Sequence, residues 1–106
     1  MQQEANLDNK LKVGKYVLVK FLTKKTIVHF AGLITEKNYE DYFLVRFMHQ
    51  KPSQNVFIFP DNVDESLVHV QDIIMCLPDP TVSQENSRLS VTQKSFGVSF
   101  ANFNMH

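Results

Sequence analysis

The stretch 42-YFLVRFMHQKPSQNVFIFPD-61 contains two runs of β-branched and aromatic residues that are separated by a polar turn. Runs of this kind predict two β-strands, one over residues 42–48 and one over residues 55–60. A proline closes the second run, because proline cannot donate to a β-ladder. Alternation places Phe57 and Phe59 on one face of this second strand, and we expect that face to belong to the core.

Further runs of the same kind lie on both sides of this stretch. They predict strands over residues 15–21, 27–37, 67–70 and 74–77, with a single helical turn at 72–74 before the last one. No window sustains the 3.6-residue period of a helix. Short strands at this spacing predict an all-β fold, a small five-stranded barrel with one short helical turn. Closure into a barrel removes the exposed strand edges that invite aggregation.

The flanks of the chain differ in composition from its centre. The chain of 106 residues has the length of one domain. We expect residues 1–10 to form a flexible arm and residues 11–78 to form the barrel. Residues 79–95 are rich in Ser, Thr and Gln, which predicts a linker.

The C-terminal segment 96–106 again alternates, with Phe96, Val98 and Phe100 on one face of an extended chain. A segment of this kind adds a strand to its own barrel, pairs with another chain to form a homo-oligomer, or binds a partner. The alternative is a flexible tail. These three residues are therefore candidate partner-binding residues.

The residues that carry chemistry show no catalytic or metal-binding pattern. The histidines lack metal-ligand spacing and only Cys76 could join them, so we expect no metal and no cofactor. The chain has no phosphate-cradling glycine loop and no nucleophile elbow, and we expect that it is not an enzyme. No apolar run approaches the roughly 20 residues of a membrane span, so no membrane partner is expected.

Charge is segregated along the chain although the net charge is zero. The stretch from Lys10 to Lys25 carries lysines and no acid, and Tyr16 and Phe21 lie between them. A basic stretch with interleaved aromatics is typical of single-strand nucleic-acid binding. The alternative is a set of solvated strand edges and loop tips. The candidate nucleic-acid-binding residues are Lys12, Lys15, Lys20, Lys24 and Lys25.

The order of several runs resembles the Tudor-like domains, which are SH3-like barrels of chromatin and RNA-processing proteins. The runs are 12-KVGKYVLVKF-21, 29-HFAGLI-34, 43-FLVRF-47 and 71-QDIIMCLP-78, so the resemblance covers residues 12–78. In that family an aromatic cage holds a methylated lysine or arginine.

Carried over onto this chain, the resemblance implies a ligand-binding aromatic rim formed by Phe21, Phe30 and Phe47, with a fourth position near His49. The segment after the third strand, 48-MHQKPSQN-55, replaces the short turn of many Tudor domains, and the usual acidic or amide partner is not identifiable from it. The alternative is that the three rings only fill the core.

The same runs, together with Phe-x-Phe-Pro-Asp at residues 57–61, are also similar to an accessory barrel domain of transposon-derived proteins of animals. That resemblance likewise implies a module without catalytic residues. We therefore expect a non-catalytic adaptor that binds a protein segment or peptide in a nuclear chromatin or small-RNA-silencing assembly, with the cytoplasm as the alternative location. The alternative functions are a nucleic-acid-binding barrel and an oligomerisation scaffold that uses the C-terminal strand.

Overall fold

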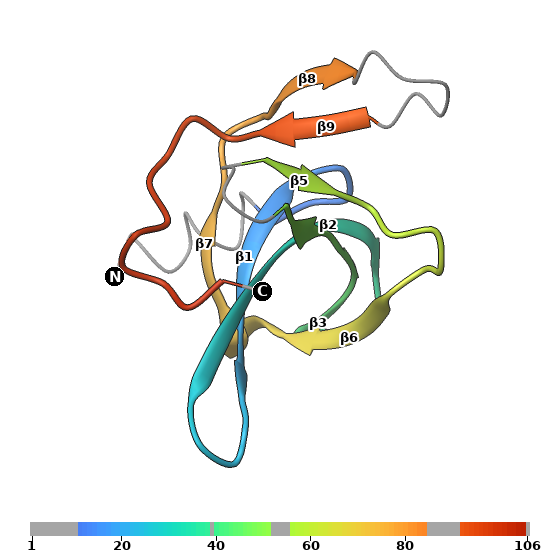
Figure 1. Cartoon of the computed structure of the whole chain (residues 1–106). Coiled ribbons are helices and arrows are strands. Elements are labelled where there is room, and N and C mark those ends of the chain that lie inside the picture. Colours follow the sequence, from blue (N-terminus) through green and yellow to red (C-terminus); the bar gives the residue numbers. More distant parts are fainter. Residues whose placement is uncertain (1–10, 39, 52–55, 85–91, 106) are drawn as a thin grey trace.

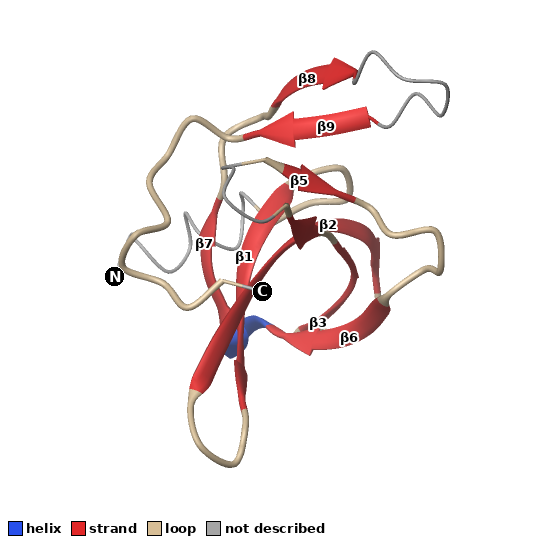
Figure 2. Ribbon diagram, viewed as in Figure 1, coloured by secondary structure: helices blue, strands red, loops and turns tan. Residues whose placement is uncertain are grey.

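The described part of the chain is all-β. The computed structural model describes residues 11–38, 40–51, 56–84 and 92–105. These residues form two antiparallel sheets and one short 3-10 turn (Figures 1 and 2). The all-β prediction is confirmed, whereas the predicted flexible arm at residues 1–10 lies outside the described residues.

The first sheet has five strands in the order β6-β3-β2-β1-β7. Its strong curvature wraps β2, β3 and β6 around a core (Figure 1). The turn η1 links β6 to β7, and β7 returns to pair with β1. The strand bounds are β1 (Tyr16–Leu22), β2 (Ile27–Lys37), β3 (Tyr42–Phe47), β6 (Glu65–His69) and β7 (Ile73–Cys76), and η1 covers Val70–Asp72.

The second sheet has four short strands in the order β4-β5-β9-β8. They are β4 (His49–Gln50), β5 (Phe57–Ile58), β8 (Thr81–Gln84) and β9 (Thr92–Ser95). The strand predicted over 55–60 corresponds to β5, which is shorter than expected and belongs to this second sheet. The fourth strand of the first sheet along the chain is therefore β6.

The segment 79–95, expected to be a linker, contributes both β8 and β9. Its polar composition is compatible with a hairpin that lies at the outside of a sheet, where Thr81 and Val82 are exposed. Lys94 of β9 pairs with Val82 on one side and with Phe57 on the other. Composition alone misses this arrangement, because the pairing partner lies far away in the sequence.

The two sheets enclose two hydrophobic cores, and β1 faces both of them. Val17, Leu18 and Val19 are all completely buried. Because side chains alternate along a strand, Val17 and Val19 enter the first core and Leu18 enters the second. The first core consists of Leu11, Val17, Val19, Ile34, Phe43, Val45, Phe47, Val68 and Ile73. The second core consists of Leu18, Ala31, Met48, Phe57, Leu77, Phe96 and Phe100.

Gly32 allows β2 to lie tightly between β1 and β3. It pairs with Val17 on one side and with Phe47 on the other. A Cβ atom at this position would run into Cγ1 of Val45 and would lie 3.1 Å from the carbonyl oxygen of Arg46. A glycine is therefore needed here for close packing rather than for an unusual backbone conformation.

The C-terminal segment does not form the predicted strand over 96–103. Gly97 has a φ of +70°, a left-handed conformation that ends the extended chain after β9. Phe96 and Phe100 nevertheless both enter the second core, and half-buried Val98 packs against it. The aromatic residues of this segment therefore complete the core of their own chain, and this leaves Phe96 and Phe100 inaccessible to a partner.

Candidate binding site

Phe21, Phe30 and Phe47 form one aromatic cluster. They come from the neighbouring strands β1, β2 and β3, and they all point toward the first core. The ring centroids of Phe21 lie 5.4 Å from those of both Phe30 and Phe47, and the Phe30 and Phe47 centroids are 5.5 Å apart. The structure thus brings together the three aromatic residues that the resemblance indicated.

These three rings pack against one another. Carbon atoms in contact are about 3.5–4.0 Å apart, so a methyl group sandwiched between two parallel rings needs centroids roughly 7 Å apart. The observed separations of 5.4–5.5 Å, between rings that are tilted or edge to face, leave no room for such a sandwich. Phe47 is only 3% exposed and forms the floor of the cluster, whereas Phe21 and Phe30 are half-buried. A ligand would therefore contact the outer surfaces of Phe21 and Phe30.

A histidine–aspartate pair borders the aromatic cluster. Nε2 of His49 lies 3.3 Å from Oδ2 of Asp64, and both side chains are about half exposed, at 50% and 48%. The His49 ring centroid is 6.4 Å from that of Phe30. The Phe47 N–H donates to the Asp64 carbonyl oxygen at 2.7 Å, which fixes the Asp64 backbone beside the cluster. The carboxylate of Asp64 is thus linked to the aromatic cluster through His49.

Asp64 is the residue of this site that the sequence did not indicate. It lies in the loop before β6, separated from His49 by 15 positions in the sequence. No local spacing connects the two residues, because β5 and its flanking loops lie between them. An exposed acidic side chain from a later loop thus lies beside His49, the fourth position that the resemblance indicated.

The five candidate lysines do not form one surface. Lys12 and Lys15 precede β1, whereas Lys24 and Lys25 lie in the turn after it. The seven residues of β1 span about 23 Å at 3.3 Å per residue, so these two pairs lie at opposite ends of the strand. Half-buried Lys20 lies between them and lines a small pocket of about 230 Å³.

The other chemically active side chains are dispersed. Within the described ranges, no three His, Cys, Asp or Glu side chains lie close enough together to hold a metal ion. The same part of the chain has no helix that is long and apolar enough to span a membrane. Burial, and secondarily the negative charge of Asp79, raise the pKa of the Tyr16 phenol above its ordinary value.

Comparison with known proteins identifies no relative of this chain. No protein family model matches it, and neither a curated protein nor a solved structure matches it. The resemblances to Tudor-like domains and to the barrel of transposon-derived proteins therefore remain predictions from the sequence runs.

Proposed function

We propose that this protein is a non-catalytic interaction module of the SH3-like, Tudor-like class that binds a protein segment. The order expected for such a barrel is four strands, a short helical turn and a fifth strand. The first sheet supports the proposal because β1, β2, β3, β6, η1 and β7 follow this order, with β7 paired to β1. The resemblance favours a nuclear chromatin or small-RNA-silencing assembly as the setting.

The observation that carries this proposal is the exposed His49–Asp64 pair, whose imidazole ring lies beside half-buried Phe30 of the aromatic cluster. Aromatic ring faces attract cations, and methylated ammonium groups suit them well. A neighbouring carboxylate adds a favourable charge interaction. A methylated lysine or arginine of an extended peptide fits this combination, lying on top of the cluster rather than between its rings.

The expected affinity is low. An exposed cation–π contact contributes about 0.5–1 kcal/mol, and an exposed ion pair contributes about 0–1 kcal/mol. A dissociation constant of 1 mM corresponds to about 4 kcal/mol, so one cationic side chain does not supply millimolar binding alone. The remainder must come from neighbouring residues of the peptide, and we expect dissociation constants no tighter than roughly 0.1 mM.

Replacement of Asp64 tests this proposal. Asp64→Asn removes the charge and keeps the shape of the side chain, and Asp61→Asn is a matched control because Asp61 is an exposed aspartate in the same loop. Binding of a trimethyl-lysine histone-tail peptide, measured by titration calorimetry or a fluorescent label, should weaken about 3- to 5-fold in Asp64→Asn and stay unchanged in Asp61→Asn. Equal affinities for the wild type and Asp64→Asn would contradict the proposal.

A further inference from the structure

The first half of β2 has an edge that β3 does not cover. β2 pairs with β1 from Ile27 to Leu33, but its pairing with β3 starts only at Gly32. In the described part of the chain, two segments contact this uncovered edge. One is Met48, whose N–H donates to the Ala31 carbonyl oxygen at 2.9 Å. The other is the end of the chain itself.

The C-terminal residues lie on this edge as an added strand would. The His29 N–H donates to the carbonyl oxygen of Asn104 at 2.8 Å, and the side-chain amide of Asn104 donates to the carbonyl oxygen of Ile27 at 3.3 Å. The ring centroid of Phe103 lies 5.0 Å from that of His29, edge to face. His29 and Met105 form a short parallel bridge. An aromatic residue, Phe103, and the amide residue that follows it, Asn104, make most of these contacts.

This end of the chain is attached less firmly than the segment before it. Phe100 is the last residue that is buried in the second core, and the chain then turns, with the Phe103 N–H donating to the Phe100 carbonyl oxygen at 3.0 Å. Asn104 is exposed, and Phe103 and Met105 are half-buried. Phe103 and Met105 pack against the second core as half-buried residues, whereas Phe100 is a buried member of that core.

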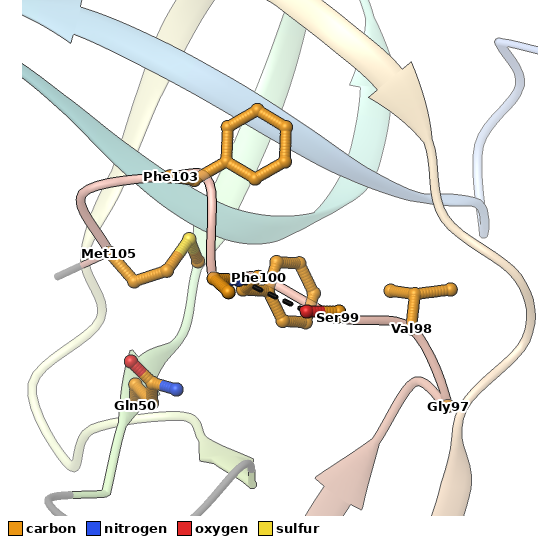
Figure 3. A pocket seen from close by; sticks show the side chains of 8 residues that line it. Gln50, Gly97, Val98, Ser99, Phe100, Phe103 and Met105 are labelled. Carbon is orange, nitrogen blue, oxygen red and sulfur yellow. Dashed lines mark hydrogen bonds between the residues drawn. The ribbon is translucent and has the colours of Figure 1, made fainter.

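A groove runs beside the docked end of the chain. Its volume is about 650 Å³, within the range typical of ligand-binding sites. Gln50 of β4 lines one part of it, and residues 97–101, Phe103 and Met105 line the rest (Figure 3). Because Ala101, Phe103 and Met105 themselves line the groove, it belongs to the docked arrangement of the tail.

We propose that the β2 edge from Ile27 to His29 is a second peptide-binding site, which the chain's own residues 103–105 occupy in the resting state. Its ligand is an extended partner segment in which an aromatic residue is followed by asparagine, because the docked tail shows that this pair fits. Addition of an extended segment to a sheet edge is a common mode of peptide recognition. Nδ1 of His29 is buried and has no hydrogen-bond partner among the described residues, so a segment that brings a hydrogen-bonding group there gains a bond.

This site is separate from the aromatic cluster. His29 and Phe30 are consecutive residues of β2, so their side chains point to opposite faces of the sheet. His29 contacts Phe103 on the side of the second core, whereas Phe30 packs on the first core. The two sites can therefore fail or succeed independently in a binding experiment.

The tail competes with a partner because it is part of the same chain. A tethered segment has an effective concentration of about millimolar or more, which a free peptide must exceed. The apparent affinity of the partner falls in proportion to the fraction of molecules whose edge is open. Release of the tail should therefore increase the apparent affinity for a peptide at least tenfold.

The experiment uses the full chain with the double substitution Phe103→Ala and Asn104→Ala. The matched control is Asn102→Ala, an exposed residue in the preceding turn. The probe is a blocked synthetic peptide with the sequence of residues 101–105, titrated up to millimolar concentration and followed by amide chemical shifts. A second peptide carries alanine at the positions of Phe103 and Asn104.

The double variant should lose the hydrogen-exchange protection of the His29 amide and should bind the first peptide saturably at that amide. The wild type and Asn102→Ala should bind at least tenfold more weakly, and the alanine peptide should not bind. Three results would overturn the proposal. The hydrogen-exchange protection of the His29 amide could be unchanged in the double variant, the first peptide could fail to bind a folded double variant saturably, or it could bind the wild type and the double variant equally. A wild-type dimer that exchanges its tails would also overturn it, because the occupant would then be a second copy.

Discussion

Phe57 tests whether the second sheet and the C-terminal segment are integral parts of this domain. The Phe57 side chain is completely buried. Its ring centroid lies 5.5 Å from that of Phe96 and 5.3 Å from that of Phe100. One residue of β5 therefore packs the second sheet against the C-terminal segment. Phe57→Ala removes both aromatic contacts and leaves a cavity in the second core.

The expected cost is large relative to the stability of a small domain. Phenylalanine-to-alanine changes in a core cost about 3–5 kcal/mol, and a domain of this size is stable by about 5–15 kcal/mol. At about 4–8 °C per kcal/mol, the melting temperature should fall by roughly 12 °C or more. Urea unfolding followed by far-ultraviolet circular dichroism measures the loss in free energy of unfolding directly.

Phe59→Ala is the matched control, because it removes the same atoms from a half-buried ring. The guanidinium carbon of Arg46 lies 4.6 Å from the centroid of this ring. Since part of the ring remains in water, we expect a cost of only about 1–2 kcal/mol. The reasoning is refuted if Phe57→Ala costs no more than Phe59→Ala, or if the wild type unfolds in two separate steps that correspond to the two sheets.

Three further predictions concern other parts of the molecule. Gly32→Ala should lower the free energy of unfolding, measured with urea, by about 1–3 kcal/mol, because the new methyl group forces β3 away from β2. An unchanged urea midpoint would contradict this and show that the sheet relaxes freely. The pKa of Tyr16 is raised in the folded state, so its contribution to stability is complete below its unfolded pKa near 10 and is lost as the pH rises through the folded value. Tyr16→Phe should therefore lose less stability than the wild type above about pH 10 in the same unfolding assay, and parallel curves would refute this. Because the lysines lie at opposite ends of β1, a single-stranded oligonucleotide should bind only weakly, even at low salt. The double substitution Lys24→Gln and Lys25→Gln should change its affinity less than twofold. Tight binding that falls steeply with salt would instead support a nucleic-acid-binding barrel.

The strands of the first sheet could be predicted from the sequence because their signals are local. Alternation of apolar residues marks β1 and β3, and the β-branched run from Ile27 marks β2. The grouping of Phe21, Phe30 and Phe47 was implied by the resemblance to Tudor-like domains, and the three rings do lie together. What the sequence could not show is how closely the three rings approach one another, since this depends on side-chain conformations.

The second sheet could not be predicted, because its pairing joins distant segments. β5 contacts β9 through Phe57 and Lys94, and nothing in either local sequence indicates the other. Leu18 lies on the face of β1 opposite Val17 and Val19, and only the second core that covers this face explains its complete burial. The proximity of Asp64 to His49 could not be predicted for the same reason, since it depends on the path of the loops between them.

The central claim is that the surface formed by Phe21, Phe30 and Asp64 binds a methylated side chain of a protein segment. Amide chemical-shift mapping with one histone-tail peptide, in its trimethylated and unmethylated forms, tests this claim most directly. We predict shifts at the amides of these three residues and of His49 that saturate and are larger for the trimethylated peptide. If neither form perturbs these amides while the spectrum shows a folded protein, the claim is wrong.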